Sequence, residues 1–241
     1  MAYINGKEIL FSPNINYGYD EGFEEGKTKE WSDFWDNAQK NGKQMTRYAF
    51  LFASNIWNGK TFRPKYSIKS NTLTSFANCF AYWTGEPISL IDRCAELGIE
   101  IDFSNANNLS SCFNSNLAVT EIGVVDTRNS TSNGGIFAYC TKLEKIEKII
   151  LKEDGTTSSF GDMFTQCYLL EEIRFEGVIG KSISFSYCEL LTEASVANII
   201  EHLMTITDGV ARTLTLHATV KAKLTDEQKT TITTTKGWTL A

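Results

Sequence analysis

The sequence predicts an α/β fold in which repeated units stack side by side into a solenoid. An apolar phrase recurs through the middle of the chain, with Phe, Cys, Leu and Ile at fixed offsets and polar residues between them. The clearest copies span 137–146 and 164–173, and a weaker copy spans 185–194. A unit of this kind cannot bury its apolar side alone, so its neighbours must cover it.

The predicted core of the solenoid consists of the apolar residues of these copies. They are Phe137, Cys140, Leu143, Ile146, Phe164, Cys167, Leu170, Ile173, Phe185, Cys188 and Leu191.

The first region, residues 1–60, is predicted to contain a short strand segment and a helix. An Asn-Gly turn signal precedes an apolar run at 9–11. Aromatic and apolar residues then recur with helical spacing over 31–38, which favours a helix at about 20–40. Glycines at 18, 22 and 26 leave a narrow stripe. Either this stripe lies close to another helix or subunit, making 17–40 an anchor or oligomerisation region, or the segment is a frayed linker.

The repeat region is predicted to span 61–192. Weaker copies surround Cys79, Cys94 and Cys112, and alternating apolar stretches follow the last two at 99–103 and 119–125. Alternation of this kind is typical of a strand with one buried face. Each unit is therefore expected to end in a short strand.

The last region, 193–241, is predicted to close the solenoid with the order helix, strand, helix, strand. An apolar stripe from Val196 to Met204 indicates a helix that closes near 208–209, with Thr192 as its cap. Residues 212–216 alternate as a strand, and Thr225 and Gln228 have the spacing of a capping box. A final strand is expected at 236–240.

All six cysteines lie in the repeat region. No C-x-x-C pair occurs, and both histidines, His202 and His217, lie outside the cysteine region. This arrangement favours reduced, buried thiols at one repeated point of each unit over disulfides or a metal site. No cofactor is expected.

Charge and composition exclude several classes of function. The net charge is −6 and no Lys/Arg block occurs, which argues against nucleic acid as a partner. No apolar run approaches the roughly 18 residues of a membrane span.

The first residues lack a basic start and an apolar stretch, so synthesis in a bacterial cytoplasm without a signal peptide is expected. Neither histidine has a partner that the sequence makes specific, and 22–28 departs from the spacing of a phosphate loop, so the protein is not expected to be an enzyme.

Aromatic residues near the cysteines are the candidate binding residues. Tyr139 and Tyr187 occupy one offset, directly before the cysteine, where Gln166 stands in another copy. Tyr82, Trp83 and Tyr168 lie nearby in sequence. Either these side chains point outward and form a ladder on one face, which suits binding, or the rings pack between neighbouring units, which is the favoured interpretation.

The phrase F-x-x-C-x-x-L-x-x-I resembles the bacterial leucine-rich repeats of the BspA-like, or Treponema-type, family over residues 73–192. The resemblance implies an irregular leucine-rich-repeat arc of short strands and a role in adhesion or recognition. Segments at 19–22, 34–36 and 62–66, together with 214–216, 224–227 and 236–240, are similar to proteins encoded in prophages of gut Firmicutes. That second resemblance implies a virion or tail-associated protein.

The expected function is therefore a non-catalytic recognition or adhesion protein of phage origin. It would bind a protein or glycan on a bacterial surface through one face of the repeat arc. Two alternatives remain open: a structural tail or baseplate component that contacts other virion proteins, and an intracellular protein-interaction module.

Overall fold

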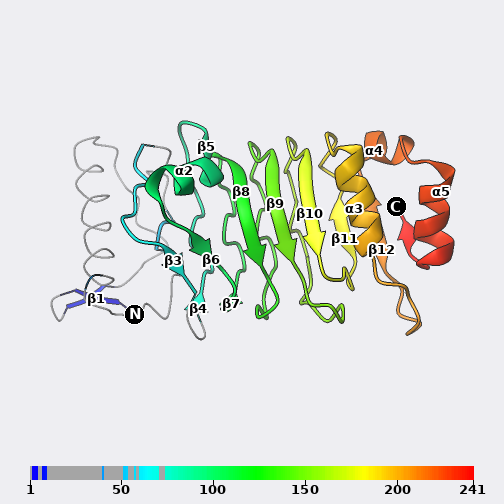
Figure 1. Ribbon diagram of the computed structural model, residues 1–241, viewed down its shortest axis with the longest axis horizontal. Coiled ribbons are helices and arrows are strands. Elements are labelled where there is room, and N and C mark those ends of the chain that lie inside the picture. The colour runs from blue at the N-terminus through cyan, green and yellow to red at the C-terminus, as the bar shows by residue number, and fades with distance from the viewer. Residues whose placement is uncertain are drawn as a thin grey trace.

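The computed structural model describes residues 2–4, 7–9, 40, 51–53, 57, 60–70 and 74–241. Over this part of the chain the fold is mixed α/β, with successive strands placed side by side along the long axis of the molecule (Figure 1). Apart from Lys40, which is helical, the predicted helix at 20–40 and the predicted oligomerisation region at 17–40 lie outside the described residues. Near the N-terminus, β1 (Ala2–Ile4) pairs antiparallel with β2 (Lys7–Ile9).

The largest sheet has four parallel strands. Its order is β10 (Glu172–Glu176), β9 (Lys145–Ile150), β8 (Val119–Asp126) and β5 (Ile88–Ser89). Ile122, Ile146 and Ile173 are in register across the three longer strands, and all three are buried. The sheet is therefore stabilised by a continuous row of isoleucines on its inner face.

The predicted leucine-rich-repeat solenoid is wrong, because the described parallel strands divide into several small sheets instead of one continuous one. The other parallel sheets are β3 (Ile68–Lys69) with β6 (Ile101–Asp102), β4 (Thr74–Ser75) with β7 (Ala106–Asn108), and β11 (Ile183–Phe185) with β12 (Thr213–Leu216) and β13 (Thr239–Leu240). Strands of two to four residues form few hydrogen bonds with the next strand, so these sheets do not extend beyond two or three strands.

One interruption is helix α2 (Leu90–Leu97), which follows β5 without a loop. The Ser89 side chain accepts a hydrogen bond from the backbone N–H of Asp92, and Gly98 ends the helix in the left-handed conformation at φ 63°. These are an ordinary N-cap and C-cap. Cys94 therefore lies on a helix and is only partly buried, so the prediction of a buried thiol in every unit is wrong at this position.

A second interruption is helix α3 (Glu193–His202), which occupies the free edge of β10 where a further strand would pair. The Ser195 hydroxyl accepts a hydrogen bond from Ile173 N at 3.0 Å, and the Asn198 side chain accepts one from Phe175 N at 2.6 Å. These side chains replace the partners that a strand would supply. The weakest copy of the repeat therefore leads into a helix, and the main sheet ends at β10.

The C-terminal region keeps several predicted details. Thr192 caps α3, and the capping box of Thr225 and Gln228 opens α5 (Asp226–Thr230), so both predictions are confirmed. A short helix, α4 (Ala218–Ala222), and a π-helical turn, η1 (Thr231–Thr235), complete the region. The prediction that α3 extends to 208 is wrong, because Leu203 forms a parallel bridge with Ile179 and draws the chain into extended structure.

The core contains a column of stacked phenylalanine rings. Its members are Phe52, Phe80, Phe113, Phe137, Phe164 and Phe185. Neighbouring rings are 4.7–5.8 Å apart between centroids and tilted by only 10–18°. Backbone hydrogen bonds keep them in step, since each of the first four phenylalanines donates its N–H to the next unit along the chain. Such aromatic pairs stabilise by about 0.5–1.5 kcal/mol beyond the burial of their area.

Three residues after the ring, the four units that contain Phe80, Phe113, Phe137 and Phe164 carry a buried hydrogen-bond donor. The donors differ in type, but each bonds to the backbone carbonyl of a phenylalanine in the preceding unit. The bonds are Trp83 Nε1 to Phe52 O (2.8 Å), Asn116 Nδ2 to Phe80 O (2.8 Å), Cys140 Sγ to Phe113 O (3.0 Å) and Cys167 Sγ to Phe137 O (3.1 Å). Successive units are therefore joined by a repeated side-chain-to-backbone bond inside the core.

This register corrects the predicted ladder of cysteines. Cys79 and Cys112 lie directly before a phenylalanine of the column, whereas Cys140, Cys167 and Cys188 lie three residues after one. These five thiols are buried, Cys94 is partly exposed, and all six are free. The units are therefore aligned by their phenylalanines, and the thiols occupy two different positions in the core.

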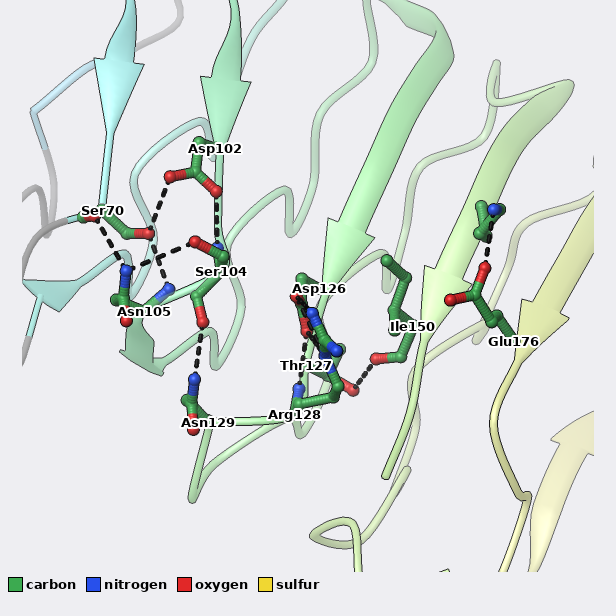
Figure 2. A network of polar contacts seen from close by, with 11 residues as sticks. Ser70, Asp102, Ser104, Asn105, Asp126, Thr127, Arg128, Asn129, Ile150 and Glu176 are labelled. Atoms are coloured by element: carbon green, nitrogen blue, oxygen red, sulfur yellow. Dashed lines mark hydrogen bonds and ion pairs between the residues drawn. The ribbon is translucent and has the colours of Figure 1, made fainter. Parts of the chain in front are cut away.

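At the ends of the strands, polar side chains hold the turns and join neighbouring segments, some within one sheet and some across two (Figure 2). The Ser70 hydroxyl accepts a hydrogen bond from Asn105 N at 2.8 Å, and the Asn129 amide donates to Ser104 O at 2.7 Å. Asp126 is held by Arg128 through a bond of 2.6 Å. These contacts satisfy backbone groups where the small sheets end.

We expect Asn116→Ala to lower the free energy of unfolding by about 2–4 kcal/mol. The Asn116 side chain is fully buried, donates to Phe80 O and accepts from the N–H groups of Ala118 and Val119. Its removal leaves those backbone groups without partners. Urea denaturation measures the change, and Asn114→Ala in the same unit is the control. Equal free energies of unfolding for the two variants would contradict a stabilising role for the hydrogen bonds of Asn116.

We expect iodoacetamide at pH 8 to modify only Cys94 in the folded protein. Burial raises the pKa of Cys94 to about 11 and that of Cys167 to about 12, and Cys94 alone is partly exposed. Its labelling is therefore slow, because about one thousandth of a thiol of pKa 11 is ionised at pH 8. Mass spectrometry should find the other five labelled only in denaturant, and Cys94→Ser should remove the native labelling.

The same shifts set the direction of a pH effect on stability. Unfolded thiols ionise above about pH 9 while the buried ones stay protonated, so the free energy of unfolding falls as the pH rises past that value.

Candidate functional site: an exposed row of tyrosines

The phenylalanine column places one equivalent residue of each unit on the surface, two positions after the ring. These residues are Tyr82, Ser115, Tyr139, Gln166 and Tyr187. Backbone bonds connect most of them from unit to unit: Tyr82 N donates to Asn114 O at 3.0 Å, and Tyr139 N donates to Thr165 O at 2.7 Å. The side chains at this position therefore form a single row along the molecule.

The tyrosines of this row are exposed to solvent. The exposed fractions are 49% for Tyr82, 43% for Tyr139 and 42% for Tyr187. Tyr168, which is 41% exposed, packs its ring edge-on against that of Tyr187 at 5.9 Å between centroids. The tyrosines therefore lie at the surface, as the outward-pointing alternative predicts. Packing between neighbouring units is found only for Tyr168 with Tyr187 and for the buried Trp83.

Exposed leucines extend this surface. Leu117, Leu169 and Leu190 are each 38–42% exposed and lie within a few residues of the row along the chain. We call the whole set the tyrosine surface; it comprises Tyr82, Ser115, Leu117, Tyr139, Gln166, Tyr168, Leu169, Tyr187 and Leu190. The sequence prediction did not include the three leucines, although each lies four or five residues after a phenylalanine of the column.

The backbone under the row is unusual. Tyr82, Ser115, Tyr139 and Gln166 all have positive φ, between 55° and 65°. The left-handed conformation costs roughly 1–2 kcal/mol for a residue with a side chain, and bulky residues adopt it rarely. Tyrosine therefore occupies this position in two units at a cost in stability, and strained positions of this kind cluster at binding sites.

Two of the predicted binding residues behave differently from the tyrosines. Trp83 is fully buried, so its assignment as a binding residue is wrong; its indole instead occupies the donor position of its unit and bonds to Phe52 O. Gln166 is half-buried and belongs to the row. Tyr82 was not recognised as equivalent to Tyr139, because alignment on the cysteines pairs Tyr139 with Asn78; alignment on the phenylalanines would have found it.

The tyrosine surface carries no ionised side chain. The nearest cation along the chain, Lys142, donates to Gly85 O at 3.3 Å. By contrast, the exposed face of the main sheet is charged, with ion pairs between Lys145 and Glu172 at 3.2 Å and between Lys148 and Glu176 at 2.7 Å. The nine members of the tyrosine surface are therefore uncharged, although the exposed Glu189 lies between Tyr187 and Leu190 in the chain.

Other hollows in the described part of the chain show no catalytic arrangement. A groove of about 400 Å³ lies between β9, β10 and α3, and a shallower one of about 540 Å³ includes His202. The His202 ring bonds to Gly177 O at 2.7 Å, and the His217 ring accepts from Thr219 N. Within the described residues, no group of three or more His, Cys, Asp or Glu residues could hold a metal ion, and no helix is long and apolar enough to cross a bilayer.

No protein-family model, curated protein or solved structure matches this chain. The resemblance to BspA-like and prophage proteins therefore stays a prediction, and the argument for function depends on the chemistry of the tyrosine surface.

We expect Tyr139→Gly to be more stable than Tyr139→Ala by about 1 kcal/mol, because glycine adopts φ of 64° without a steric cost. Urea unfolding of both variants measures this difference. The same pair of substitutions at Tyr187, whose φ is not positive, is the control and should favour alanine or neither. A more stable alanine variant at 139 would contradict the strained backbone.

Proposed function

We propose that this protein is a non-catalytic recognition protein that binds a protein or glycan on a bacterial surface through the tyrosine surface. The observation that carries the proposal is the repeated exposure of tyrosine at one position of successive units. Tyrosine offers a large amphipathic contact area and loses little conformational entropy on binding.

Three features support a binding role over a purely structural one. Tyr82 and Tyr139 adopt a costly left-handed backbone conformation in which glycine would be cheaper. Their hydroxyls form no hydrogen bond within the described part of the chain, so they remain available to a partner. The rings also stand on a rigid core of stacked phenylalanines, so their spacing is already set before binding, which lowers the entropic cost of association.

We expect the double variant Tyr139→Ala, Tyr187→Ala to lose at least tenfold in affinity for intact bacterial cells of the host, because two stacking contacts are removed. Flow cytometry of the fluorescently labelled protein measures the binding. Tyr66→Ala is the matched control, since Tyr66 is also an exposed tyrosine but belongs to none of these units. Equal binding by wild type and double variant, with both folded by circular dichroism, would contradict the proposal.

A further inference from the structure

The residues of the tyrosine row alternate in chemistry along the molecule. Tyrosine occupies the position in the first, third and fifth of the successive units, at 82, 139 and 187. Between them stand Ser115 and Gln166, which carry a hydroxyl and an amide. At this one position the row therefore reads aromatic, polar, aromatic, polar, aromatic, while the fourth unit also exposes Tyr168, whose ring packs against that of Tyr187.

The spacing of this alternation follows from the backbone pairing. Adjacent units are hydrogen-bonded to each other at this position, from Tyr82 N to Asn114 O and from Ser115 N to Ala138 O. Backbones paired in this way lie about 4.8 Å apart, so tyrosines two units apart are separated by about 10 Å. This distance is comparable with the disaccharide repeat of an extended glycan chain.

A β-1,4-linked glycan has a matching alternation. Successive sugars in its extended form are turned over, so every second ring presents the same face to one side. The apolar face of a pyranose stacks on an aromatic ring, and its edge offers hydroxyls to a serine or an amide. The tyrosines would then meet every second sugar, and Ser115 and Gln166 would meet the hydroxyls of the sugars between them.

Shape agrees with an extended ligand. The nine residues of the tyrosine surface offer aromatic rings, hydroxyls and an amide, whereas the exposed Glu189, between Tyr187 and Leu190 in the chain, disfavours a polyanion such as a phosphate backbone. Backbone bonds connect the row over four units, and the ring contact between Tyr168 and Tyr187 joins the fifth. A row of this length favours a chain over a single small molecule. The chemistry and the length of the tyrosine surface are both compatible with sugars that carry different substituents.

We propose that the ligand of the tyrosine surface is an extended β-1,4-linked polysaccharide, stacked on Tyr82, Tyr139 and Tyr187 at every second sugar. This proposal rests on the proposed function and names the chemical class of its ligand.

The first test is titration calorimetry of the full chain with cellohexaose and chitohexaose. Both hexasaccharides should bind, because the tyrosines contact the apolar faces of the pyranose rings and both ligands have the same disaccharide repeat. Each hexasaccharide should bind about tenfold more tightly than the corresponding trisaccharide, because the trisaccharide contacts fewer tyrosines. Maltohexaose, whose α-linkages coil the chain, should bind at least tenfold more weakly. Absence of binding to both β-linked hexasaccharides, or equal binding of maltohexaose, would overturn the proposal.

The second test changes the spacing while keeping the residues. The exchange variant Ser115→Tyr, Tyr139→Ser has the same composition, and both positions share the left-handed backbone, so the backbone strain is the same; the exchange removes one hydrogen bond, from the Ser115 hydroxyl to Asn114. It places two tyrosines in neighbouring units and breaks the alternation. We expect a loss of at least tenfold in affinity for cellohexaose at unchanged melting temperature. Equal affinity would show that the alternation is not recognised.

Pretreatment of bacterial cells separates this proposal from the broader one. Binding that survives protease but is lost after periodate oxidation of sugars supports a glycan ligand. Binding that survives periodate but is lost after protease overturns it, and leaves the recognition function in place with a protein partner.

Discussion

The architecture depends on one repeated constraint: a buried phenylalanine ring stacks on the ring of the neighbouring unit, and a donor three residues later bonds to the backbone of that unit. The ring supplies apolar burial and the donor fixes the register, so a slip by one residue would break both. The donor changes from tryptophan to asparagine to cysteine along the chain. The position three residues after the ring therefore requires a hydrogen-bond donor that reaches the phenylalanine carbonyl of the preceding unit, and several residue types meet this requirement.

The same constraint organises the surface. Because the phenylalanine is fixed inside, the residue two positions later must lie outside, and in most units the backbone turns there in the left-handed conformation. A side chain at this position is held at a repeated interval whatever its chemistry. Tyrosine in alternate units then becomes a regular array on a rigid support, and the cost of the strained backbone is offset by the stability of the core.

The sheets do not need to be continuous for this arrangement to persist. Helix α2 interrupts the upstream strands, and helix α3 covers the edge of β10 through Ser195 and Asn198. The column of rings passes these points, from Phe80 to Phe113 and from Phe164 to Phe185. Strand pairing connects the four units of the main sheet, and the column of rings extends this connection to Phe52 and Phe185 beyond it.

The sequence by itself determined which residues are buried in the clearest copies, where several strands begin and how α3 and α5 are capped, because these follow from local periodicity and local hydrogen bonds. It could not determine the common register of all units. The cysteines suggested one alignment, whereas the stacked rings impose another, and only the latter makes Tyr82 equivalent to Tyr139 and buries Trp83. Division of the strands into small sheets was likewise decided by tertiary contacts, since whether a strand edge meets a strand or a helix depends on residues far away in the chain.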